Sequence, residues 1–282
     1  RHPRLAVAIL FVAVIGTTGT LVGLERGRAY ERHLAARAEF ATVAGAVEDA
    51  WGAGDPARQE ELTPRLEESA RVVLALEPDA ADVHLDRARL RFRLGWLDGV
   101  DADLRRAFEL LGEDDPRARA LRARVRLARL LAARDETRRG IDDPEDAAEA
   151  KLADLEARNP RLVDLRDEAV EDFRIAAAGV DDPAEQELCE AQISYLRGEW
   201  EEVCRSAESS LDTRVTAEGY WLAGIARLAQ LEGLSIDEQL PAHFAMIESS
   251  IRYLDAATAV GRGFGEAWAA RAEAKAKWIE YR

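Results

Sequence analysis

Histidines are the first place to look for chemistry in this chain of 282 residues. The four histidines are His2, His33, His84 and His243. None lies in an HExxH motif or in another cluster with the spacing of metal ligands, so the sequence predicts no zinc site. The chain also has neither a GxxxxGK[ST] phosphate loop nor a GxSxG nucleophile motif. We therefore expect no catalytic residues, no metal and no cofactor in this chain.

Two further patterns resemble reactive sites but have simpler explanations. The GRGFG motif of residues 261–265 lacks the preceding strand that a dinucleotide-binding fingerprint requires. We interpret it as a turn between two helices. Paired aspartates at 142–143 and 181–182 resemble a catalytic dyad or a calcium loop, but each pair directly precedes a proline. An aspartate before proline is typical of a helix N-cap, so we expect these pairs to begin helices.

Composition narrows the classes of partner. The net charge is −15 and the pI is about 4.9. Binding to nucleic acid needs a cationic field, so we expect no nucleic-acid partner, and broad adhesion to anionic lipid headgroups is disfavoured for the same reason. Cys189 and Cys204 form no CxxC motif, and we expect two buried thiols rather than a disulfide. Abundant Arg and Ala with few Lys suggest a bacterial, GC-rich genome.

An apolar run without charges extends from Leu5 to Leu24, between Arg4 and Glu25. Twenty helical residues at about 1.5 Å each span roughly 30 Å, the hydrocarbon thickness of a bilayer. The rival interpretation is a cleaved signal peptide, whose apolar core has about 7–15 residues and ends at an Ala-x-Ala-like site. Because this run is longer and lacks such a site, we favour an uncleaved single-pass anchor, residues 1–25.

Small residues in this run suggest a second role for it. Gly19 and Gly23 form a GxxxG motif, and Gly16 lies on an adjacent row. Such residues let another membrane helix approach closely, although glycine is also common in membrane helices without pairing. Basic residues on both sides of the run leave its orientation open, and we lean towards an extracytoplasmic C-terminal region.

The rest of the chain has the pattern of an all-α protein. Strand signals are nearly absent, and Gly and Pro gather at breaks between segments with apolar residues three and four apart. Residues 85–108 align with residues 188–211 at an offset of 103, which is three times 34 plus one. Shifts of 34 residues relate 66–74 to 100–108 and 169–176 to 203–210. A repeat of about 34 residues predicts a solenoid of helix pairs.

The small and aromatic residues within these repeats resemble the tetratricopeptide repeat (TPR) family. The resemblance is carried by Ala169-x3-Phe173-x2-Ala176, Ala88 with Gly95, and Ala191 with Gly198. It implies a TPR-like α-solenoid of antiparallel helix pairs over residues 58–282, preceded by a juxtamembrane helix at 26–57. We expect repeats at 80–111, 116–178, 182–211 and 214–260, with insertions at 135–159 and 231–242 and a terminal helix at 264–281. Residues 26–52 and 58–77 are candidates for an additional, first pair.

The resemblance also implies a concave groove for a protein partner, lined by the first helix of each pair. Aromatic residues and arginines there suit an extended or helical peptide. The residues implied are Leu85, Arg89, Phe92, Arg93, Leu188, Gln192, Tyr195, Leu196, Trp221, Ile225 and Leu228. Each of them has a competing interpretation, which is packing against a neighbouring helix.

One predicted helix carries a run of arginines, although the chain as a whole is acidic. They are Arg117, Arg119, Arg122, Arg124, Arg126 and Arg129. The run suits contact with an anionic peptide, but we favour pairing with Glu and Asp of adjacent helices.

Three functions fit these features. The first is a membrane-anchored interaction protein that holds a partner in its groove or helps to assemble a membrane complex. The second is the C-terminal membrane-plus-TPR region of a bacterial serine/threonine kinase, with which a start at Arg1 is compatible. The third is a structural subunit packed through its membrane helix.

Overall fold

The computed structural model describes residues 3–141, 143, 152–233 and 236–280. It describes their side chains except at 3–24, 26, 98, 152, 232–233 and 236–240. Within these residues the chain forms twelve α-helices, one 3-10 turn and no strand, which confirms the all-α prediction. The helices are α1 (Pro3–Ala53), α2 (Pro56–Leu76), α3 (Ala81–Arg93), α4 (Leu97–Leu111), α5 (Pro116–Arg139), α7 (Leu152–Arg158), α8 (Arg161–Gly179), α9 (Pro183–Arg197), α10 (Trp200–Thr213), α11 (Ala217–Ala229), α12 (Ile236–Val260) and α13 (Gly265–Glu280), with η1 (Gln230–Gly233) as the 3-10 turn.

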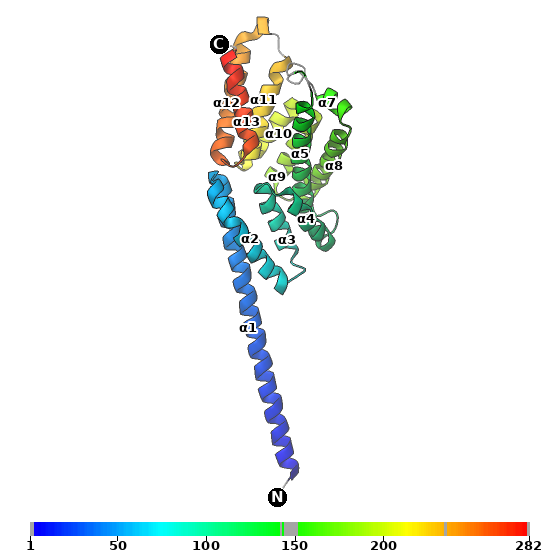
Figure 1. Ribbon diagram of the computed structural model, residues 1–282, viewed down its shortest axis with the longest axis vertical. Helices are drawn as coiled ribbons and strands as arrows, with labels where there is room; N and C mark the ends of the chain where they lie inside the picture. The colour runs from blue at the N-terminus through cyan, green and yellow to red at the C-terminus, as the bar shows by residue number, and fades with distance from the viewer. Residues whose placement is uncertain (1–2, 142, 144–151, 234–235, 281–282) are drawn as a thin grey trace.

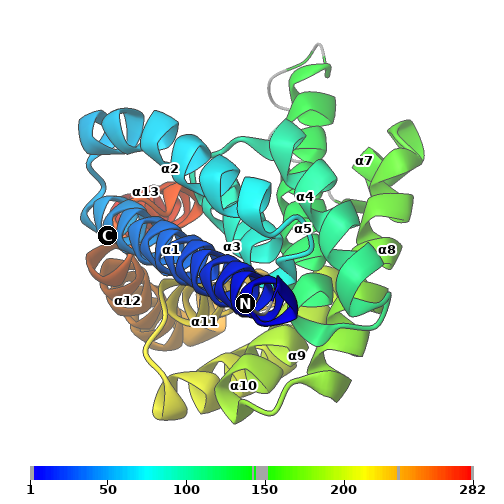
Figure 2. The same cartoon turned by 90° about the horizontal axis from the view of Figure 1, so that it is seen from below.

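The helices pack in pairs of neighbours along the chain. Helix α1 packs on α2, α3 on α4, α5 on α8, α9 on α10 and α11 on α12, and α13 covers α12 at the end. Figure 2 looks along the axis around which these pairs are arranged and shows the chain returning to its first pair. The helices therefore form one turn of a solenoid-like bundle, in which the first helix of each pair faces inward.

Aspartate–proline steps begin three of the helices, as the sequence predicts. The side chain of Asp55 accepts a hydrogen bond from the backbone N–H of Arg58, and Asp115 and Asp182 cap α5 and α9 in the same way. Each following proline occupies the first helical turn, where its missing N–H costs nothing. The pair at 142–143 lies in part outside the described residues.

Two glycines make the turns inside the second and fourth helix pairs. Gly95 and Gly198 have φ values of +78° and +74°, in the left-handed region that glycine enters without strain. The backbone N–H of each residue after the glycine, Trp96 and Glu199, donates to a carbonyl of the preceding helix. The alignment of these two glycines in sequence therefore reflects one turn used twice.

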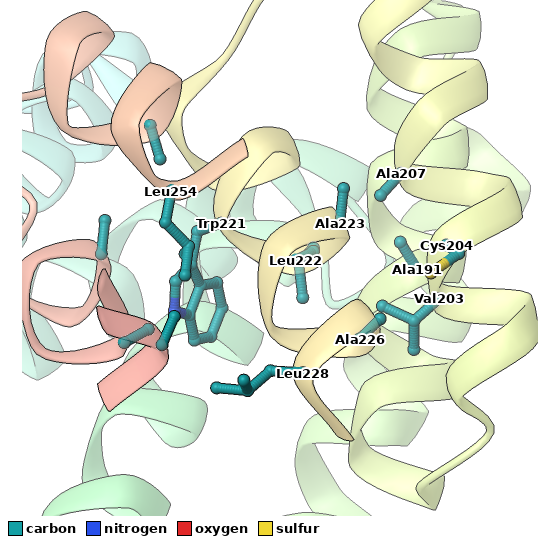
Figure 3. Close-up of a cluster of buried hydrophobic side chains, with 14 of the residues drawn as sticks. Ala191, Val203, Cys204, Ala207, Trp221, Leu222, Ala223, Ala226, Leu228 and Leu254 are labelled. Carbon is teal, nitrogen blue, oxygen red and sulfur yellow. The ribbon is translucent and has the colours of Figure 1, made fainter. Parts of the chain in front are cut away.

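Small residues allow the helices to approach closely. Ala191, Ala207, Ala223 and Ala226 are fully buried where α9, α10 and α11 meet (Figure 3). Larger side chains such as Leu222 fill the space between successive pairs. This pattern explains the repeat of small residues in the sequence, because a larger side chain at those positions would push the helix axes apart.

Both cysteines are free and buried, as expected from the sequence. Burial raises the pKa of the Cys189 thiol to about 12. Since the thiolate is the reactive form, this thiol is inert at neutral pH.

The first helix is much longer than the others. It runs from Pro3 to Ala53, so it crosses the predicted boundary between residues 25 and 26 without a break. Its C-terminal part packs on α2 through Phe40, Val43 and Val47, which are buried. Its N-terminal part extends away from the bundle (Figure 1). The segment predicted to be juxtamembrane therefore forms half of the first helix pair.

The membrane-anchor prediction stays a prediction. Among the residues whose side chains the structure describes, no helix is both long and apolar enough to cross a membrane. The side chains of residues 5–24, including Gly16, Gly19 and Gly23, lie outside that set.

The two expected insertions are partly helical. Helix α5 continues to Arg139, several residues into the predicted insertion at 135–159, and α7 forms near its end. In the predicted insertion at 231–242, η1 is followed by α12, which begins at Ile236 and contains Pro241. Long helices therefore extend beyond the repeat in both places, because apolar spacing continues past the repeat boundary.

Candidate binding cavity

A cavity of about 850 Å³ occupies the inside of the solenoid turn. Its wall is formed by the end of α1, by α3, α5, α9 and α11, and by the loop that leads into α13. Aromatic side chains of Trp51, Phe92, Trp221 and Phe264 contribute to this wall, together with leucines from α3, α5 and α9. A concave, mostly apolar space with a few polar groups is the usual form of a ligand site.

The two ends of the solenoid close the cavity by meeting at a seam. The backbone N–H groups of Arg262 and Gly263 donate to the carbonyls of Gly52 and Trp51, at 3.1 and 3.0 Å. A Cβ atom on Gly263 would lie 2.5 Å from the carbonyl oxygen of Trp51. The glycine motif at 261–265 is therefore a turn between helices, as predicted, and one that also lets the last helix pair touch the first.

Six of the eleven predicted groove residues line this cavity. Four of them lie on α3, one on α9 and one on α11. They are Leu85, Arg89, Phe92, Arg93, Leu188 and Trp221. Helices far apart in sequence thus present one common face to the inside of the turn.

The other five predicted residues pack elsewhere. Gln192 is fully buried and donates a hydrogen bond to Glu218. The ring of Tyr195 packs against Trp221, with 5.4 Å between the two ring centroids. Leu196 joins the buried cluster of α5, α8 and α9. Leu228 and Ile225 belong to the cluster of α9 to α13. Near their C-terminal ends, α9 and α11 turn the predicted face towards neighbouring helices, so these positions support the cavity wall instead of lining it.

The predicted groove residues leave out most of the cavity lining, and α5 contributes the largest group among those left out. Leu121, Leu127 and Leu131 line the cavity, as do Trp51 and Phe264 at the seam. The register of the repeat that contains α5 is obscured by the following insertion, which hides its inward face. A usable signal exists for α5, because its leucines and Arg124 recur at helical spacing.

A network of charged groups crosses the wall between α5, α9 and α11. Arg124 donates to Glu185 at 2.7 Å and to Glu218 at 3.1 Å, and Arg214 also pairs with Glu185 at 2.7 Å. Burial raises the pKa of Glu218, although Arg124 opposes this effect. The pKa of Glu185 is lowered, since its two arginines outweigh the opposing effect of burial. The network holds three elements together at the cavity floor.

A second group of charges lies at the α1–α3 wall. Glu48 accepts from Arg93 at 2.6 Å and lies 3.2 Å from Arg89. The guanidinium of Arg93 stacks over the ring of Trp51, 4.9 Å from its centroid. This stacking ties the seam to α3 by a cation–π contact.

The arginine run on α5 is paired within the protein. Arg119, Arg122 and Arg126 converge on Asp172 of α8, whose side chain is only 1% exposed. Arg124 belongs to the network described above, and Arg129 pairs with Asp101 at 2.7 Å. The remaining member of the run pairs with the N-cap of its own helix, through Arg117 and Asp115. The favoured interpretation, pairing with acidic residues of adjacent helices, therefore holds for five of the six.

Comparison with protein-family models and with curated proteins finds no match for this sequence. Within the described part of the chain, no group of three or more His, Cys, Asp or Glu side chains is arranged to hold a metal ion. The cavity therefore offers a ligand a concave, largely apolar surface with charged groups held in place by ion pairs.

Proposed function

We propose that this chain is a non-catalytic, single-pass membrane protein whose TPR-like solenoid binds a peptide segment of a partner protein. The observation that carries the proposal is the cavity lined by Trp51, Phe92, Trp221 and Phe264. Large aromatic residues gathered in a concave site supply much of the binding free energy in protein recognition. An extended peptide fits such a space better than a folded domain does.

The first helix supports a role at the membrane in this proposal. It is one helix from the apolar run of residues 5–24 to Trp51, which lines the cavity. At about 1.5 Å per residue, the helix holds the cavity some tens of ångströms from the start of the run. In the proposal, the apolar run anchors the protein in a bacterial membrane, and α1 presents the solenoid at a fixed distance on the extracytoplasmic side.

The test is affinity purification of the full chain from membranes in mild detergent, with bound proteins quantified by mass spectrometry. Ala128 lines the cavity on α5, whereas Ala132 lies one turn further along and is exposed. The Ala128→Trp variant fills the cavity, and Ala132→Trp is its matched control. We expect a partner that is lost with Ala128→Trp and retained with Ala132→Trp.

Two results would count against peptide binding in the cavity. One is a partner that both tryptophan variants retain but that Gly19→Leu/Gly23→Leu loses, which would favour a structural subunit packed through the membrane helix. The other is the same set of proteins from every variant and from beads alone.

A further inference from the structure

Two arginines near the end of α5, Arg134 and Arg138, differ from the others in the protein. Both are partly buried. Every other described arginine that is partly buried has a carboxylate oxygen within 4.0 Å of its guanidinium, whereas within the described residues these two have none. The Nε atoms of both side chains are buried and have no hydrogen-bond acceptor.

The positions of these arginines continue the stripe of α5 that lines the cavity. Arg138 lies seven residues after Leu131, and Arg134 lies seven residues after Leu127. Residues seven apart share a helix face, and both leucines line the cavity. The two positions therefore lie on the same face of α5 as these leucines, beyond the last α5 residue that lines the cavity.

Tyr195 gives a second, independent location for Arg134. Burial raises the pKa of the Tyr195 hydroxyl, and Arg134 opposes that shift through its charge and a side-chain hydrogen bond. The Tyr195 ring packs against Trp221, which lines the cavity. Arg134 thus lies beside the aromatic wall, at the same end of the cavity.

Each of these arginines has a buried Nε–H group without an acceptor and no described carboxylate within ion-pair distance. The guanidinium stays charged at any physiological pH, and a buried N–H without an acceptor destabilises the fold. Like charges four residues apart on a helix also repel each other. The last turn of a helix favours a cation, which accounts for part of the placement of Arg138. It accounts for neither the buried Nε atoms nor Arg134.

We propose that Arg134 and Arg138 form the receptor for an acidic side chain of a peptide whose apolar residues occupy the cavity. This inference rests on the proposed function and adds the chemistry of the ligand. A carboxylate accepts two parallel hydrogen bonds from the Nε and Nη atoms of one guanidinium, which is the pairing that the buried Nε–H groups lack. The nearby negative charges, Asp135 and Glu266, both act on Tyr195 but lie beyond ion-pair distance of the two arginines.

The first experiment selects peptides from a random dodecamer library displayed on mRNA, using the immobilised full chain in detergent. We expect peptides with apolar residues and an Asp or Glu at a fixed spacing from them. Selection on the Arg134→Gln/Arg138→Gln variant should keep the apolar pattern and lose the acidic residue. Enrichment of apolar peptides without a fixed acidic residue would overturn this inference and leave the proposed function standing. No enrichment in any selection would count against the proposed function itself.

The second experiment measures the affinity of the best peptide by fluorescence anisotropy. Changing its acidic residue to the amide should weaken binding to the wild type by about tenfold or more, as expected for a charge-assisted pair. The same change should have no effect on the double variant. Arg139→Gln is the matched control, because Arg139 is an exposed arginine of the same helix.

A third comparison tests whether the bound carboxylate belongs to an acidic side chain of the peptide or to its C-terminus. If amidation of the peptide's C-terminus weakens binding while the side-chain change does not, the acidic side-chain assignment is wrong. Equal loss with Arg139→Gln and with the double variant would also overturn the assignment, since it would show a general effect of charge. Circular dichroism melts of each variant verify that the helices remain folded.

Discussion

The two parts of α5 use arginine in opposite ways. From Arg119 to Arg129 the guanidinium groups meet carboxylates of α4, α8, α9 and α11. Arg134 and Arg138 meet none among the described residues, although they too are partly buried. The same residue type on one helix therefore stabilises the fold in one stretch and leaves hydrogen-bonding capacity unused in the next.

This difference shows why the number of arginines is a poor guide to a binding site. The dense run at residues 117–129 attracts attention in the sequence, but the structure engages its charges internally. The two later arginines look ordinary in the sequence. What distinguishes them is that no described carboxylate lies within ion-pair distance, a property that depends on residues tens of positions away.

The largest effect on stability is expected from Asp172→Asn. Three guanidinium groups converge on this buried carboxylate, and the change leaves them without their common counter-ion. Removing one partner of a buried ion pair costs about 3–5 kcal/mol. Urea denaturation followed by circular dichroism should show a loss in that range. Asp101→Asn is the control, because Asp101 is 49% exposed and its pair with Arg129 contributes at most about 1 kcal/mol. Equal losses of stability in the two variants would show that the buried carboxylate of Asp172 contributes no more than the exposed one of Asp101.

The carboxylate of Asp172 also predicts how the stability of the fold changes at acidic pH. Burial alone would raise the pKa of Asp172, but the hydrogen bonds and charges of its arginines hold it below the ordinary value. A group with a lowered folded-state pKa stabilises the fold above its unfolded pKa, and this contribution is lost as the pH falls through the folded value. Wild-type protein should therefore lose stability below about pH 5 more steeply than Asp172→Asn does. Parallel pH profiles of the two proteins would refute the assignment.

The double change Arg134→Met/Arg138→Met should have a smaller effect of opposite sign. It removes two charges and two buried N–H groups without an acceptor, and it keeps the apolar stems. We expect unfolding free energy to stay the same or to rise by about 1 kcal/mol. A loss above about 1 kcal/mol would show that these arginines have a structural partner, and would place them with the first group.

The smallest effect is expected from Glu218→Gln, at the cavity floor beside Arg124. Burial raises the pKa of Glu218, so the folded protein holds this proton more tightly than the unfolded chain does. Stability from this group is present below the unfolded pKa and is lost as the pH rises through the folded value. The variant should therefore gain less than about 1 kcal/mol at pH 7 relative to wild type. A marked loss at pH 7 would mean that the ion pair with Arg124 outweighs burial.

Helix pairs and their limits follow from local sequence. Asp115 with Pro116 and Asp182 with Pro183 begin helices, and Gly95 and Gly198 end them, because caps and left-handed turns depend on a few adjacent residues. The inward face of α3 was also predictable, since it follows from the repeat register. The sequence therefore predicts the fold class and six residues of the cavity lining.

Contacts between distant segments were not predictable in this way. Asp172 is about fifty positions from the arginines it joins, and Gly263 meets Trp51 across more than two hundred. No periodicity in one sequence encodes such pairings. The partners of Arg124, the seam and the lack of a described carboxylate beside Arg134 all depend on how the helices are placed in space.

The seam at Gly263 also limits how this protein can vary in length. An open solenoid tolerates the gain or loss of a repeat, because each unit touches only its neighbours. Here the last unit must also reach the carbonyl of Trp51 in the first, so an added or deleted helix pair would separate the two ends. The contact between the two ends therefore fixes the number of helix pairs, as closure does in a ring. The number of pairs in turn fixes the size of the cavity.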